Sequence, residues 1–146
     1  RQLGQTKPAR VLDVGSGGGL PGVVLAIAET AWDVTCVDSV AKKAAFIRQV
    51  ASELALPNLH ALHTRVQALR TEPFDVITSR AFASLAEFTH STSTLLAPGG
   101  VWMAMKGKHP ADELAALPLG VTAFHVESLT VPGLHAERCL IWMRQP

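Results

Sequence analysis

Apolar runs and polar breaks alternate along the chain, and their spacing predicts strands and helices in turn. Short apolar runs closed by glycine, proline or charged residues are typical of buried strands, whereas apolar residues three and four positions apart are typical of helices that cover a sheet. The runs predict strands at 9–14, 33–38, 59–66, 74–79 and 101–106. Helices are predicted at 23–29 (with Pro21 in the first turn), 40–56, 85–96 and 110–117.

Strand and helix alternate through the first five strands, which predicts a parallel sheet with helices on both faces. Two further apolar runs, at 124–131 and 137–144, are separated only by the short segment 132–136. So short a connection favours an antiparallel hairpin at the end of the sheet. The pattern therefore predicts an α/β protein with a mostly parallel, seven-stranded, Rossmann-like sheet and a C-terminal antiparallel hairpin. A chain of 146 residues suits a single domain over 1–146.

Five glycines, at positions 15, 17, 18, 19 and 22, follow the first predicted strand within the stretch "VLDVGSGGGLPGVVLAI". The first strand-to-helix turn of a doubly wound sheet lies where ligands bind, and bare backbone there lets a ligand lie against the turn. The nicotinamide fingerprint G-x-G-x-x-G fails from Gly15, because its third glycine falls on Leu20. From Gly17 it matches through Gly22, but its first glycine then comes late after the strand. A phosphate-binding P-loop is excluded, because no lysine follows the glycines.

Two acidic residues end the first two predicted strands and narrow the ligand class. Asp13 would repel a pyrophosphate, but it would attract a ligand with a cationic sulfonium and an amino group, which describes S-adenosylmethionine. Asp38 lies 19 residues beyond Gly19, where a carboxylate can accept hydrogen bonds from both ribose hydroxyls. The alternative is that Asp38 or Ser39 caps the helix that follows.

Several separate stretches together resemble the RsmG (GidB) family, whose members make 7-methylguanosine in bacterial small-subunit ribosomal RNA. They are "LDVGSGGGLPG" (12–22), "DSVAKKAAFIRQV" (38–50), "SRAFASL" (79–85), "MKGK" (105–108) and "VPGLHAERCLI" (131–141). The glycine turn is shared with most methyltransferases, whereas "GLPG" and "SRAFASL" together are much more specific. Family members carry helices before the first strand, which this chain is expected to lack.

The resemblance implies a class I S-adenosylmethionine-dependent methyltransferase fold, S-adenosyl-L-methionine as cofactor, and 16S ribosomal RNA as substrate, in the small ribosomal subunit or an assembly intermediate. The expected cofactor site comprises Asp13, Gly15, Ser16, Gly17, Gly19, Leu20, Asp38, Ser39, Arg65, Val66 and Arg80. The expected RNA-binding residues are Lys42, Arg65, Arg80 and Lys106, of which Arg80 and Lys106 are assigned to the catalytic step. The alternative for each of these cations is an ordinary solvated charge.

The residues at the end of the fourth predicted strand and directly after it bear on which atom would be methylated. They read Thr78 to Phe82, "TSRAF", and not the Asp/Asn-Pro-Pro-aromatic motif with which many methyltransferases hold an exocyclic amine. Guanine N7 already has a lone pair and no proton to lose, so catalysis would consist of positioning the reactants. Arg80 could bind the guanine or its phosphate, and Phe82 could stack on the base or pack in the core.

Composition sets limits on these hypotheses. The net charge is only +1, so an RNA site must be a local basic patch. Cys36 and Cys139 lie in apolar runs and are expected to be buried free thiols, and no run is long enough for a membrane span. His60 and His63 would point to opposite faces of a strand, which argues against a metal site.

We expect a cytoplasmic monomer. A small-molecule methyltransferase and an inactive RNA-binding or assembly factor remain the alternatives.

Overall fold

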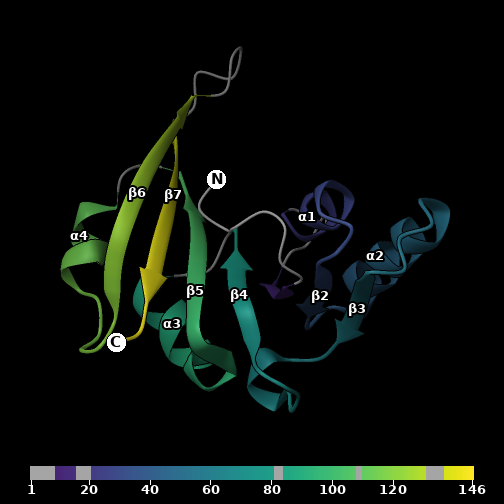
Figure 1. Ribbon diagram of the computed structural model, residues 1–146, viewed down its shortest axis with the longest axis horizontal. Coiled ribbons are helices and arrows are strands. Elements are labelled where there is room, and N and C mark those ends of the chain that lie inside the picture. Colours follow the sequence, from purple (N-terminus) through teal and green to yellow (C-terminus); the bar gives the residue numbers. More distant parts are fainter. Residues whose placement is uncertain (1–8, 16–20, 81–83, 108–109, 131–136) are drawn as a thin grey trace.

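The computed structural model describes residues 9–15, 21–80, 84–107, 110–130 and 137–146. Within these ranges the chain forms a seven-stranded sheet with the strand order β3-β2-β1-β4-β5-β7-β6 (Figure 1). The strands are β1 (Arg10–Val14), β2 (Asp33–Asp38), β3 (Leu59–His63), β4 (Phe74–Ser79), β5 (Leu96–Lys106), β6 (Thr122–Thr130) and β7 (Glu137–Arg144). The helices are α1 (Gly22–Ala28), α2 (Ala41–Glu53), α3 (Leu85–Thr92) and α4 (Ala111–Ala115), with short 3-10 turns η1 (Val66–Ala68) and η2 (Ser93–Leu95).

The sheet is parallel from β3 to β5, and β7 pairs antiparallel with both β5 and β6. This confirms the predicted α/β architecture and the antiparallel hairpin at its end. The chain builds outward from β1 through β2 to β3, and then returns to place β4 on the other side of β1. The strand order therefore reverses between β1 and β4, which is where open α/β sheets bind their ligands.

Two apolar layers hold the helices against the sheet, one on each face. Successive side chains of a strand point to opposite faces, so Val11 and Leu12 enter different layers. The layer with Leu12 includes Phe88 of α3, and the layer with Val11 includes Ile47 of α2. The indole Nε1 of buried Trp102 donates to the hydroxyl of Thr92 at 2.9 Å, so this polar atom is satisfied inside the core. None of the helices in the described ranges is long and apolar enough to cross a membrane.

The third strand is shorter than predicted, because it ends at His63 and does not continue to Val66. After Arg65 the backbone tightens into η1, in which the N–H of Ala68 donates to the carbonyl of Arg65 at 3.0 Å. The prediction that Arg65 and Val66 end the strand was therefore wrong, and both lie in the turn that follows it.

The junction between α3 and β5 also differs from the prediction. The helix ends at Thr92, whose hydroxyl donates back to the carbonyl of Phe88, and the chain then tightens into η2. The strand begins at Leu96 and passes through Pro98 and Gly99, where the sequence predicts only a stop. A register shift against β4 and a φ of +78° at Gly99 accommodate these residues. The other elements begin and end within three residues of their predicted bounds.

Candidate active site

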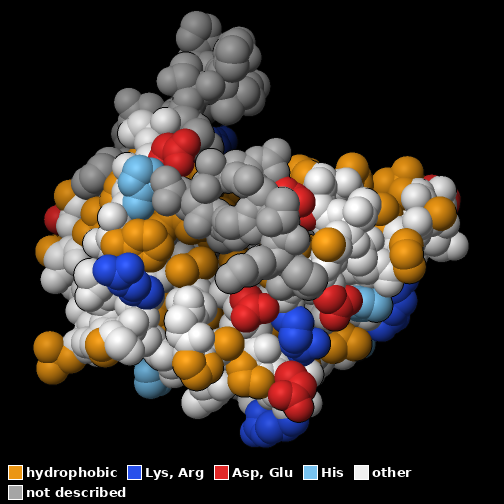
Figure 2. Space-filling model, in the orientation of Figure 1, with side chains coloured by type: hydrophobic (Ala, Val, Ile, Leu, Met, Phe, Trp, Pro, Cys, Tyr) orange, Lys and Arg blue, Asp and Glu red, His pale blue; other side chains and the backbone are white. Residues whose placement is uncertain are grey.

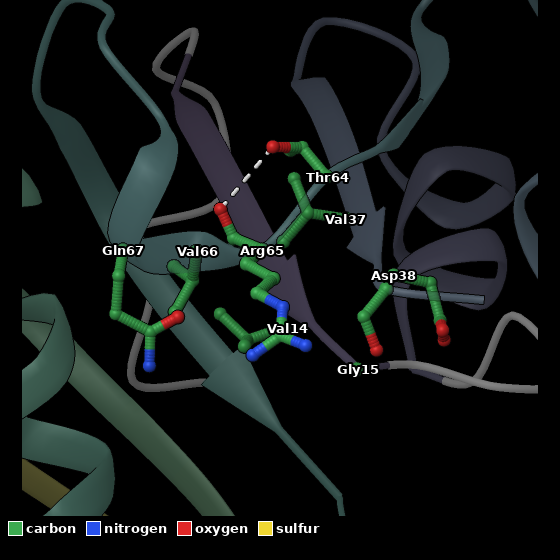
Figure 3. Close-up of a pocket in the computed structure, with 9 residues that line it drawn as sticks. Val14, Gly15, Val37, Asp38, Thr64, Arg65, Val66 and Gln67 are labelled. Atoms are coloured by element: carbon green, nitrogen blue, oxygen red, sulfur yellow. Dashed lines mark hydrogen bonds between the residues drawn. The ribbon is translucent and has the colours of Figure 1, made fainter. Parts of the chain in front are cut away.

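A pocket of about 320 Å³ opens at the carboxyl ends of β1 and β2, next to the point where the strand order reverses. Three chain segments line it: Val14 and Gly15, then Val37 to Ser39, then Thr64 to Gln67. Figure 3 shows Asp38 on one side of the pocket and Arg65 to Gln67 on the other. The structure thus brings together five of the residues assigned to the cofactor from sequence, namely Gly15, Asp38, Ser39, Arg65 and Val66.

Gly15 begins the glycine turn with a backbone conformation that favours glycine. Its φ is +63°, and its N–H donates to the carbonyl of Val37 at 2.8 Å. A Cβ at this position would meet no atom within 4 Å, so the requirement for glycine comes from the backbone angle and not from space. The remaining residues assigned to this turn, Ser16, Gly17, Gly19 and Leu20, lie outside the described residues.

Asp13, two residues before Gly15 on β1, is fully buried. Its Oδ2 accepts a hydrogen bond from the N–H of Gly22 at 2.8 Å, and the Sγ of Cys36 lies 4.0 Å from the same oxygen. Burial raises the pKa of Asp13 from 3.8 to about 7, the Gly22 hydrogen bond lowers it in part, and the charge of Asp38 raises it further. A cation placed near this carboxylate would offset the free-energy cost of burying its negative charge.

Two buried polar atoms on β1 and β4, between which the strand order reverses, have no hydrogen-bond partner within the described part of the chain. They are Oδ1 of Asp13 and the hydroxyl oxygen of Thr78. Asp13 and Thr78 are register neighbours on β1 and β4, so their side chains point to the same face of the sheet. Buried polar groups are normally satisfied, so this pair fits a ligand or water that carries N–H or O–H groups.

Asp38 is nearly buried at the end of β2 and makes a hydrogen bond just before α2. It is only 6% exposed, and its Oδ1 accepts a hydrogen bond from the N–H of Val40 at 2.9 Å, immediately before α2. Val40 is itself the N-cap residue of α2, and this helix has no side-chain cap hydrogen bond, so the capping alternative for Asp38 and Ser39 was wrong. Asp38 also lines the pocket. Ser39 beside it is exposed, and its carbonyl lies 3.2 Å from Nε2 of His63.

The third lining segment includes residues that the sequence analysis did not assign. Thr64 and Gln67 flank Arg65 and Val66 in the pocket wall, and the Thr64 hydroxyl donates to the Arg65 carbonyl at 3.3 Å. Val66 is buried, whereas Gln67 is exposed and carries an amide that can both donate and accept. No sequence motif identifies Gln67 as a pocket residue. Only the tight turn η1 places it at the pocket.

The basic residues assigned to RNA come from elements that meet at the same edge of the sheet. Lys42 lies in the first turn of α2, Arg80 follows β4 directly, and both are exposed. Lys106 ends β5, but its side chain is only 15% exposed and pairs with Glu113 at 3.0 Å. On the face shown in Figure 2, basic and acidic side chains of the described residues are interspersed and form no single large basic patch.

His60 and the two cysteines take structural positions. His60 contacts Asp33 at 2.6 Å, and no group of three metal-ligating side chains occurs in the ranges that the structure describes. Cys36 and Cys139 are both buried and free, as expected from their apolar surroundings. Phe82 and Lys108 lie outside the described residues.

Comparison with known proteins identifies the family. The model of the family described as rRNA small subunit methyltransferase G matches residues 2–141. The chain belongs to this family. Two relatives, each named ribosomal RNA small subunit methyltransferase G, are 65% identical to it: one from Acidovorax sp. (strain JS42), over 93% of this chain, and one from Polaromonas naphthalenivorans, over 97%. This confirms the resemblance drawn from the motifs.

The chain spans about 60% of the Acidovorax relative and 63% of the Polaromonas relative. Solved methyltransferase structures share the fold. TrmN from Thermus thermophilus superimposes with a TM-score of 0.76 at 21% identity, over 97% of this chain and 46% of that one. A geranyl diphosphate C-methyltransferase from Streptomyces coelicolor, solved with S-adenosyl-L-homocysteine, superimposes with a TM-score of 0.75 at 15% identity. The match covers 99% of this chain and 75% of that one. The expected class I methyltransferase fold is therefore confirmed.

Proposed function

We propose that this chain is an S-adenosylmethionine-dependent methyltransferase that modifies N7 of a guanine in 16S ribosomal RNA, within the small subunit or an assembly intermediate. The observation that carries the proposal is the pocket between Gly15, Asp38 and Val66 at the carboxyl ends of the strands. Membership of the rRNA small subunit methyltransferase G family supports the choice of substrate. We further propose that the protein acts as a monomer in the cytoplasm.

The residues around the pocket suit the cofactor in chemistry as well as in position. The Asp38 carboxylate is the expected acceptor for ribose hydroxyls, and the tight turn after β3 offers Val66 as an apolar surface for adenine. Buried Asp13, whose Oδ1 has no hydrogen-bond partner among the described residues, suits the cationic end of the ligand. When bound, the cofactor supplies a methyl group on a cationic sulfur.

The guanine side of the reaction requires positioning and no general base. Guanine N7 carries a lone pair and no proton, so the chain's residues need only hold the base in line with the methyl group. Exposed Arg80, directly after β4, suits the guanine edge or an adjacent phosphate. Lys106 at the end of β5 supplies a second cation on the same edge, held by Glu113.

The test is transfer of labelled methyl from S-adenosylmethionine to 16S ribosomal RNA from cells that lack this gene, presented both as free RNA and as small subunits. Mass mapping should then place the new methyl on N7 of a guanine. Cofactor titration by calorimetry accompanies each assay. A protein that binds the cofactor but modifies neither form of RNA would contradict the proposed substrate, and one that does not bind it would contradict the proposed cofactor.

The role of Arg80 is tested in the same assay. Arg80→Ala should slow single-turnover transfer by at least about tenfold while leaving the cofactor Kd unchanged, because Arg80, although also assigned to the cofactor from sequence, is not among the residues that line the pocket and is proposed to act on the RNA. Arg144→Ala is the matched control, since Arg144 is also exposed but ends an antiparallel strand at the opposite edge of the sheet. Lysine at position 80 should restore transfer if the contact is a phosphate, and should restore little if it is a bidentate contact to the base.

A further inference from the structure

Glu113 joins three elements at the edge of the sheet where the candidate site lies. It lies in the first turn of α4, and its Oε1 accepts from Nζ of Lys106 at 3.0 Å and from the N–H of Leu85 at 2.9 Å. Lys106 is the last residue of β5, and Leu85 is the first residue of α3. One carboxylate oxygen therefore connects β5, α3 and α4.

The burial of the ion pair gives it more weight than a surface salt bridge. The side chain of Lys106 is 15% exposed and that of Glu113 is 31% exposed. A lysine withdrawn from water to this extent requires a counter-charge, because an uncompensated ammonium is costly to bury. The pair also restricts a four-carbon side chain that would otherwise sample many rotamers. Glu113 is thus one of the groups that hold the Lys106 ammonium in place.

Glu113 also holds one end of the segment that carries Arg80. Strand β4 ends at Ser79 and α3 begins at Leu85, so Arg80 lies in the connection 80–84. The carboxyl side of this connection is held by the bond from Leu85 to Glu113, and the Ser84 side chain accepts from the N–H of Glu87 at 3.0 Å. Glu113 therefore contacts Lys106 directly and also holds Leu85, the residue at which α3 begins, five positions after Arg80.

The strand register places Lys106 and Glu113 beside Ser79, the residue that precedes Arg80. Ser79 pairs with Ala104 on β5, and Lys106 lies two residues further along the same face. The hydroxyl of Ser79 is buried and has no hydrogen-bond partner among the residues that the structure describes. Ser79, Lys106 and Glu113 therefore converge on the face that α3 and α4 cover.

We propose that Glu113 is a positioning residue for the guanine side of the active site, where it fixes the Lys106 ammonium and the amino end of α3 so that Lys106 and Arg80 approach the RNA together. The inference rests on the proposed function. It assigns Glu113 no contact with the cofactor, since the pocket is lined from β1, β2 and the turn after β3.

The test compares Glu113→Ala, Glu113→Gln and the control Asp112→Ala, an exposed carboxylate next to Glu113 on the same short helix. At saturating RNA, Glu113→Ala should lower the single-turnover transfer rate by at least about tenfold, with the cofactor Kd unchanged. Glu113→Gln should recover part of the rate, because its amide oxygen can still accept from Leu85. Asp112→Ala should behave as the wild type.

A double-variant comparison separates positioning from general stabilisation. If Glu113 acts through Lys106, Glu113→Ala should cost much less in a Lys106→Ala background than in the wild type. An equal loss in both backgrounds, or a wild-type rate for Glu113→Ala, would overturn the inference alone. Glu113→Ala could fail to fold. In that case a wild-type rate for Glu113→Gln, which removes the negative charge that pairs with Lys106, would overturn the inference as well. A wild-type protein that transfers no methyl would instead overturn the proposed function, and this inference with it.

Discussion

Replacing Asp13 with asparagine should remove a large pH dependence from the folding free energy. The carboxyl group is fully buried, and its pKa is raised from 3.8 to about 7, mainly by burial. Between these two pH values the unfolded chain loses a proton that the folded chain keeps, so stability falls as pH rises through this window. Below it both states are protonated and the cost is absent. Above about pH 7 the full cost of ~4 kcal/mol applies.

The assay is urea unfolding of wild type and Asp13→Asn at intervals from pH 4 to pH 8. Asparagine can still accept from the Gly22 N–H, but its amide N–H group would lie where Oδ1 has no partner, at a constant cost of about 1–3 kcal/mol. The informative quantity is therefore the change with pH in the difference between the two proteins, expected to reach ~4 kcal/mol in favour of the variant. Asp112→Asn, at an exposed carboxylate, should follow the wild-type profile. Parallel profiles for wild type and Asp13→Asn would refute the reasoning.

The same substitution should act in the opposite direction on cofactor binding. A cationic ligand stabilises the ionised carboxylate, so wild-type affinity should rise with pH through about 7 and then level off, whereas Asp13→Asn should bind weakly at every pH. Calorimetry in two buffers with different ionisation enthalpies would detect the proton that the wild type releases below pH 7. A variant that binds as tightly as the wild type at pH 8 would show that Asp13 does not serve the cofactor.

Two further substitutions test the packing and the ribose contact. Gly22→Ala should lower the free energy of unfolding by about 1–3 kcal/mol in a urea titration, because its Cβ would lie 2.5 Å from Sγ of Cys36 and 2.6 Å from Oδ2 of Asp13. Gly107→Ala, where a Cβ would meet nothing within 4 Å, should leave stability nearly unchanged, and equal losses would refute the packing argument. Asp38→Ala should weaken cofactor binding in calorimetry by about 1–3 kcal/mol. A loss below about 0.5 kcal/mol would mean that Asp38 serves only the turn before α2.

The sequence by itself determined the architecture and several of the residues that line the pocket. Apolar periods of two and of three to four residues depend on local chain geometry, so they predicted the strands, the helices and the C-terminal hairpin. The sequence also predicted that Gly15 and Asp38 would lie close together, because both follow or end a strand and the carboxyl ends of parallel strands meet at one edge. Gly15, Asp38 and Ser39 line one pocket for this reason, whereas Arg65 and Val66 reach it from the turn after β3.

Only the tertiary structure decided what surrounds those residues. Gln67 reaches the pocket because the chain tightens after β3, and Lys106 pairs with Glu113 because α4 packs at the end of β5. The raised pKa of Asp13 comes from burial beneath Gly22, and Gly22 must be glycine because Cys36 of β2 lies against it. Each of these properties depends on atoms that belong to different elements of the chain. A periodic pattern reports which face of its own element a residue occupies, but burial, charge pairing and close contact arise only when the elements pack together.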